Sequence, residues 1–173
     1  MSGSPFDPEL LGALFAQHHE ELFRYAARFT GDADVAEDVV QEAFMRLAER
    51  PPNESGALRA WLFRAATTIA IDAHRTRRRR SELAQAGVDR LPMGEVGPDP
   101  AQAAEHADLR ARVRAALERL EPRDRAILLM REEGFAHHEI ADAVGTTTKS
   151  VGTMIARALD KLSKHLELDE SDI

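Results

Sequence analysis

Along most of this chain, apolar residues recur at steps of three and four positions, and this period limits the fold more than any other feature. It places apolar side chains on one face of an α-helix, whereas a strand alternates apolar and polar residues at every second position. The period fails over 81–108, where six glycines and prolines interrupt it. Such a composition is typical of a linker. The sequence therefore predicts an all-α protein with two small helical domains, at 8–80 and 109–166, joined by a flexible acidic linker at 81–108.

Three helices are expected in the first domain. The first ends at Gly31, and the second is expected to begin at a D-x-x-E capping box formed by Asp34 and Glu37. The second helix ends before Pro51, because proline disrupts the interior of a helix. The third is expected from about residue 55 to residue 80, with an apolar stripe along one side.

Four helices are expected in the second domain. One ends before Pro122, and the next occupies 123–133. A short helix at 137–144 is followed by a turn at Gly145 and by a longer helix from 148 to about 166. A short helix, a tight turn and a longer helix form the helix-turn-helix pattern. Many helical hairpins share this pattern, so the pattern alone leaves the function open.

Charge is distributed in blocks along the chain. The formal net charge is −7, which argues against a nucleic-acid partner. Residues 59–80, however, carry seven arginines and one aspartate, a net charge of +6, and residues 81–108 carry one arginine and six acids, a net charge of −5. Because a phosphate responds to the local field, the basic block keeps nucleic-acid binding open.

The sequence carries no signature of an enzyme or of a metal site. It has no cysteine, which excludes disulfides, thiolate metal sites and thiol catalysis. The histidine pairs at 18–19 and 137–138 are adjacent, so on a helix their side chains diverge by about 100°. No nucleotide-binding loop, nucleophile elbow or HExxH sequence is present. We expect no enzymatic activity, no cofactor and no metal.

No targeting or membrane segment is visible in the sequence. The first residues have neither a basic region nor an apolar region of the secretory type. No apolar stretch is long enough to span a bilayer. We therefore expect a cytoplasmic protein with no membrane insertion.

Five arginines at 75–80 form the densest charge in the chain. Guanidiniums this close repel one another unless an anion neutralises them, and phosphates would do so without reading the base sequence. The alternative is a solvated helix end that interacts with the helix dipole. The position of the run, at the end of an amphipathic helix with two further arginines, favours phosphate binding.

The second helix is expected to expose an acidic face opposite its apolar stripe, formed by Glu37, Asp38, Gln41, Glu42, Met45 and Glu49. Most acidic helix faces are simply solvated. The alternative is a docking face for a basic partner protein.

Three segments, in order, resemble the sigma-70 family of RNA polymerase sigma subunits. The segment AEDVVQEAF at 36–44 is similar to the core-binding pattern AEDLVQEAF of that family. The segment at 58–80 resembles the helix that reads and opens the −10 promoter element, and the segment at 117–162 resembles the domain that reads the −35 element. No segment resembles the family's region three, and that layout is typical of the extracytoplasmic-function (ECF) group.

The resemblance implies a sigma factor that binds core RNA polymerase and directs promoter-specific initiation. Residues 8–80 would form a domain like region 2, and residues 109–166 would form a helix-turn-helix domain like region 4. The residues expected to dock on the clamp helices of the polymerase β′ subunit are Asp38, Gln41, Glu42 and Met45, and the β flap is expected as a second contact. The residues expected at the −10 element are Trp61, Arg64, Thr67, Thr68, Asp72, Arg75, Arg77, Arg78, Arg79 and Arg80. The residues expected at the −35 element are Lys149, Ser150, Gly152, Thr153, Met154 and Arg157.

Some positions depart from the family pattern. Thr68 stands where the family usually has asparagine, and Gly152 and Met154 stand where lysine and arginine are common. These departures concern which promoter is read. Trp61 lies on an apolar stripe, so we expect it to belong to the core with one edge available to DNA.

Other functions remain open from the sequence alone. The chain could titrate polymerase without directing initiation, or it could regulate transcription through the helix-turn-helix alone. An anti-sigma factor is a further partner that the resemblance allows. The acidic linker next to the basic block could also compete with DNA for the arginines.

Overall fold

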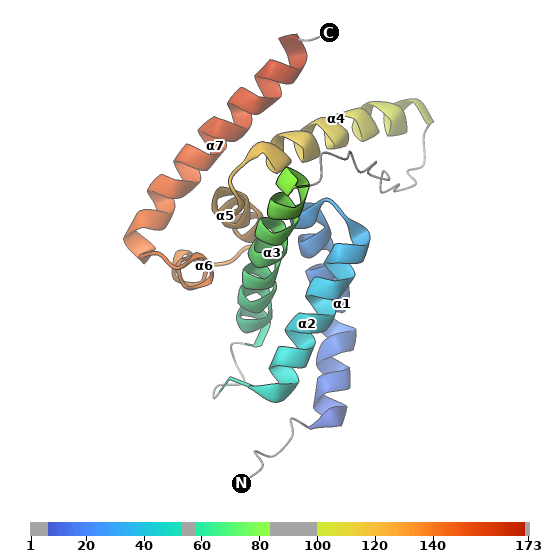
Figure 1. Cartoon of the computed structure of the whole chain (residues 1–173), viewed down its shortest axis with the longest axis vertical. Helices are drawn as coiled ribbons and strands as arrows, with labels where there is room; N and C mark the ends of the chain where they lie inside the picture. Colours follow the sequence, from blue (N-terminus) through green and yellow to red (C-terminus); the bar gives the residue numbers. More distant parts are fainter. Residues whose placement is uncertain (1–6, 53–57, 84–99, 172–173) are drawn as a thin grey trace.

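The computed structural model describes residues 7–52, 58–83 and 100–171, and the side chains of residues 7–52, 58–80 and 107–167. Within these ranges every element is a helix and none is a strand, which confirms the predicted all-α class. The helices are α1 (Pro8–Thr30), α2 (Ala33–Glu49), α3 (Leu58–Leu83), α4 (Pro100–Arg119), α5 (Pro122–Glu132), α6 (His137–Val144) and α7 (Thr148–Ser171) (Figure 1). Most of the expected linker, residues 84–99, lies outside the described residues, and so does its expected competition for the arginines.

The start of α2 differs from the predicted capping box. The N-cap is Asp32, whose carboxylate accepts hydrogen bonds from the backbone N–H groups of Asp34 at 3.0 Å and Val35 at 3.2 Å. Gly31 adopts a φ of 70°, a left-handed conformation that ends α1 and suits glycine. This turn brings Asp32 into the extended conformation of an N-cap, two residues before the expected one. The prediction of a capping box at Asp34 and Glu37 was therefore wrong.

Helix α4 begins at Pro100, inside the segment that the sequence assigned to the linker. Proline is favoured in the first turn of a helix, and the following alanines have the highest helix propensity. The sequence 101–108 lacks the apolar stripe that marks a packed helix, so periodicity gave no signal there. Helix α7 continues to Ser171, beyond the expected end at about 166.

The two helical groups, α1–α3 and α4–α7, pack against each other and share one cluster of buried residues. The ring of Phe135, in the loop between α5 and α6, lies 4.8 Å from the ring of Phe63 on α3. The Tyr25 hydroxyl lies 2.6 Å from the hydroxyl of Thr67, which also contacts the sulfur of Met130 at 3.8 Å. The sequence predicted two domains joined by a linker, and it gave no indication that the two would contact each other.

Arg125 on α5 is the largest buried side chain at the boundary between the groups, with 1% of its surface exposed. Its guanidinium donates hydrogen bonds to the backbone carbonyls of Leu117 at 2.8 Å, Glu118 at 2.7 Å and Leu120 at 3.3 Å, around the end of α4. It also donates to the carbonyl of Phe29 near the end of α1, at 2.5 Å. The last carbonyls of a helix have no partner within that helix, so one side chain satisfies groups from two helices.

We expect Arg125→Met to destabilise the protein by about 3 kcal/mol, because it leaves several buried carbonyls without their donor. Urea unfolding measured by circular dichroism gives the free energy. Arg24→Met is the matched control, since Arg24 is exposed and its ion pair among the described side chains is with Glu20 on its own helix; it should cost less than about 1 kcal/mol. Equal losses in the two variants would contradict the structural role of Arg125.

Candidate functional site

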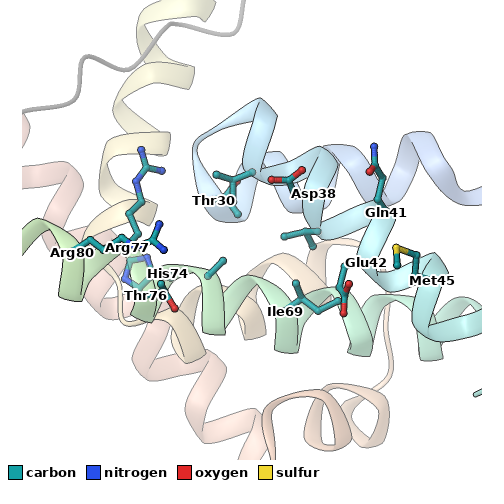
Figure 2. Close-up of a pocket in the computed structure, with 13 residues that line it drawn as sticks. Thr30, Asp38, Gln41, Glu42, Met45, Ile69, His74, Thr76, Arg77 and Arg80 are labelled. Atoms are coloured by element: carbon teal, nitrogen blue, oxygen red, sulfur yellow. The ribbon is translucent and has the colours of Figure 1, made fainter. Parts of the chain in front are cut away.

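The predicted docking residues lie together on α2. Asp38, Gln41 and Met45 are exposed, and Met45 has 58% of its surface accessible although it is apolar. Glu42 is partly buried and accepts a hydrogen bond from the guanidinium of Arg46 at 2.8 Å. The steps of three and four between these residues place them on one face of the helix. All four line a groove between α2 and α3 (Figure 2).

Six of the predicted −10 residues form a single row along α3. The residues are Trp61, Arg64, Thr68, Asp72, Arg75 and Arg79, at steps of three and four, and none of them lines the groove with α2. Five of them are exposed, and Trp61 is partly buried against the core, as expected for a core residue with one free edge. We call this set the α3 row. It presents three guanidiniums to one side of the molecule.

The remaining predicted −10 residues lie elsewhere on α3. Thr67 is fully buried: its hydroxyl donates to the backbone carbonyl of Phe63 at 2.7 Å and meets Tyr25. In this conformation it cannot contact DNA. Burial raises the pKa of Tyr25 well above its usual value, so the phenol stays protonated next to Thr67.

Arg77 and Arg80 line the groove between α2 and α3, on another side of the helix from the α3 row. Arg77 lies 3.4 Å from the Asp32 carboxylate. Arg78 is exposed and engages another group of the protein. The five arginines of the run therefore do not share one surface.

In the second helical group, α4–α7, the candidate site lies on α7. Lys149, Gly152, Thr153 and Arg157 are exposed and recur at steps of three, one and four, so they share one face. The other two predicted residues are oriented differently. The hydroxyl of Ser150 lies 2.8 Å from that of Thr147, before the helix, and Met154 is partly buried against the core.

Gly152 has no packing reason to be a glycine. A Cβ added there would lie 3.8 Å from the imidazole carbon Cε1 of His137, an ordinary van der Waals distance. The turn that orients α7 is instead fixed by Gly145, which has a φ of 66° and whose carbonyl accepts a hydrogen bond from Arg123 at 3.0 Å.

Arg59 is a residue whose role the sequence did not reveal. Its guanidinium lies over the rings of Phe135 at 4.4 Å and Phe63 at 4.9 Å, and it pairs with Glu21 at 3.2 Å. It also donates to the backbone carbonyl of Glu133 at 3.3 Å. Arg59 therefore links α1, α3 and the loop after α5, although its charge suggested membership of the basic block. The aromatic residue at the fourth position after it was the available signal.

Across the ranges with described side chains, no three histidines, aspartates or glutamates gather in a way that could hold a metal ion. No helix in those ranges is both long enough and apolar enough to cross a membrane.

Sequence models of two sigma-factor regions match the chain. Sigma-70 region 2 matches residues 14–80, and Sigma-70, region 4, matches residues 110–162. The first match contains the predicted docking residues of α2 and the α3 row, and the second contains the exposed face of α7. These matches define the chain as a protein with two sigma-70 regions.

Curated relatives define the group within that class. The ECF RNA polymerase sigma factor SigL of Mycobacterium tuberculosis is 32% identical, over 91% of this chain and 89% of the relative. SigE of Mycolicibacterium smegmatis is 32% identical, over 92% of this chain and 62% of the relative, and SigG of Mycobacterium tuberculosis is 35% identical, over 86% of this chain and 47% of the relative. The chain thus spans only 47% to 62% of the length of SigG and SigE. It belongs to the ECF sigma factors of the sigma-70 family.

Solved structures share the arrangement of helices. The sigma factor RpoE, in complex with the anti-sigma factor NepR from Bartonella quintana, aligns with a TM-score of 0.68 at 21% identity, over 91% of this chain and 97% of RpoE. That likeness concerns the fold alone. CnrH, in complex with the cytosolic domain of CnrY, aligns with a TM-score of 0.59 at 27% identity, over 94% of this chain and 91% of CnrH.

We expect Gly152→Ala to raise the free energy of unfolding by about 0.5–1 kcal/mol, because alanine restricts the unfolded chain and the site has room for its Cβ. The same variant should weaken binding to duplex DNA if the α7 backbone approaches the bases closely. Gly12→Ala is the matched control, since Gly12 is also exposed within a helix and no atom of the described residues lies within 4 Å of its added Cβ. An equal gain in stability with unchanged DNA binding in both variants would show that Gly152 has no role in DNA contact.

Proposed function

We propose that this chain is a sigma factor that binds core RNA polymerase and directs promoter-specific initiation of transcription. Membership of the ECF family supports this function. The observation that carries it is the separation of two exposed faces on neighbouring helices. The acidic face of α2 suits a basic protein partner, and the α3 row, with Arg64, Arg75 and Arg79, suits a phosphate backbone.

In this proposal residues 8–80 bind core polymerase and open the −10 element, and residues 109–166 read the −35 element. The polymerase contacts are the clamp helices of β′ and the β flap. The chain acts as a subunit and not as an enzyme, and it acts in the cytoplasm with its polymerase. Because RpoE and CnrH were solved with the partners NepR and CnrY, an anti-sigma factor is a further proposed partner.

Promoter-directed run-off transcription with purified core polymerase tests the proposal as a whole. We expect a transcript of defined length only when this chain is present. Binding to polymerase without a transcript would identify a protein that titrates polymerase. Promoter binding without polymerase association would identify an autonomous regulator.

The docking face can be tested by reversing its charge. We expect Asp38→Lys combined with Glu42→Lys to abolish binding to core polymerase, because both carboxylates would repel a basic partner surface. The control is Glu9→Lys combined with Glu20→Lys, which makes the same change in charge at exposed positions of α1. Fluorescence anisotropy of the labelled chain gives the two affinities, and thermal melting should differ little between the variants. Unchanged affinity in the α2 variant would remove the docking assignment.

The −35 contact can be tested by its dependence on salt. Lys149→Ala should weaken promoter binding by the holoenzyme and lower the slope of log affinity against log salt by about one, since one phosphate contact is lost. Lys164→Ala is the control, because Lys164 lies near the other end of α7 and pairs with Asp160 at 2.7 Å. If wild-type initiation is the same on a promoter with a scrambled −35 element, α7 only tethers the chain to DNA and does not select the promoter.

A further inference from the structure

The groove between α2 and α3 has two chemically different ends. Its volume is about 690 Å³, and Val39, Ile69 and Ala73 contribute apolar lining. Figure 2 shows Arg77 and Arg80 at one end, and Glu42, Met45 and Ile69 toward the other. A partner that fits this groove must offer an apolar edge together with charges of both signs.

Helix geometry separates the two groove arginines from the α3 row. Arg77 follows Arg75 by two positions, which rotates its side chain by about 200° around the helix axis. Arg80 is rotated by about 140° from Arg75 on the same measure. A straight helix that presents Arg75 and Arg79 to one partner therefore presents Arg77 and Arg80 to a different side. The groove lining agrees with this calculation, since it includes Arg77 and Arg80 and excludes Arg75 and Arg79.

The electrostatics of the groove favour a carboxylate over a phosphate backbone. Arg77 already lies 3.4 Å from a carboxylate, that of Asp32 at the start of α2. Asp38 and Glu42 line the same groove, and their negative charge would repel a continuous run of phosphates. Burial and the neighbouring guanidiniums of Arg125 and Arg78 lower the pKa of His74, so its imidazole is neutral near pH 7. The positive charge that lines this end therefore comes from Arg77 and Arg80.

We propose that Arg77 and Arg80 belong to the protein-docking surface and not to the DNA-binding surface. The occupant of the groove is a helix of the core polymerase, with basic residues that meet Asp38 and Glu42 and an acidic residue that meets the two arginines. This inference rests on the proposed function, because the groove continues the α2 face assigned to polymerase. The stretch from Ile69 to Arg80 is about 16 Å long, which accommodates about three turns of a partner helix.

Two charge-reversal pairs on the same helix test this assignment. Arg77→Glu with Arg80→Glu should weaken binding to core polymerase at least about tenfold, because each glutamate would repel the partner's carboxylate. Its affinity for duplex DNA, measured with the free full-length chain at about 0.15 M salt, where charges more than about 8 Å apart are largely screened, should stay within about twofold. Arg75→Glu with Arg79→Glu makes an identical change in charge on the α3 row. It should weaken DNA binding and leave polymerase affinity nearly unchanged.

A third variant removes the effect of a lost internal contact. Arg80→Glu alone keeps the pair between Arg77 and Asp32, and the side chains in the described part of the chain form no ion pair with Arg80. It should still weaken polymerase binding, with an unchanged melting temperature. If the groove variants instead weaken DNA binding as much as the row variants and leave polymerase affinity intact, the arginines contact DNA and the inference is wrong. The α2 reversal at Asp38 and Glu42 then shows separately whether the docking assignment itself survives.

Discussion

The buried guanidinium of Arg125 holds the helical group α1–α3 against the group α4–α7. The other contacts between the two groups depend on this packing. A planar group with five N–H donors can satisfy several acceptors at once, and here it meets the carbonyls at the ends of α1 and α4. The C-terminal end of a helix carries partial negative charge, so two such ends offset part of the cost of burying a cation. The guanidinium also lies 5.3 Å from the ring centroid of Phe29. The contacts of Thr67 with Met130 and of Arg59 with Phe135 lie along the boundary that this arrangement sets.

Helix α3 faces three different environments, because its three sides are chemically distinct. One side, with Phe63 and Thr67, is buried against α1 and the second half. A second side carries the α3 row, and a third faces the groove with α2. Thr67 belongs to the first side, so a contact between Thr67 and DNA requires both Tyr25 on α1 and Met130 on α5 to move away from it. The same helix therefore couples the packing of the halves to the availability of part of its predicted DNA surface.

The positions of most helices could be predicted from the sequence. The start of α4 and the contacts between the two helical groups could not, for physical reasons. The apolar period located the helices, because burial of one face dominates their stability. It did not locate the start of α4, since alanine favours a helix without marking a face. The contact of Arg125 with Phe29 joins residues 96 positions apart, and no local pattern records it. The division of the arginine run, in contrast, was available from helix geometry alone, but the resemblance treated the run as one set.

The two candidate DNA surfaces, on α3 and on α7, carry unequal positive charge and would contribute unequally to promoter binding. The α3 row contains three arginines, and Arg78 adds exposed charge nearby, whereas the exposed start of α7 offers Lys149 and Arg157. Each phosphate contact contributes a salt-dependent increment of affinity, so in the proposed promoter complex the larger share of that term would fall to α3. The α3 row also contains Asp72, a carboxylate that accepts hydrogen bonds but repels phosphate. A row with both signs of charge cannot act as a uniform basic surface. In the proposed promoter complex its guanidiniums would therefore meet phosphates on either side of a position where Asp72 faces a base or water, which would restrict the register of the strand along α3.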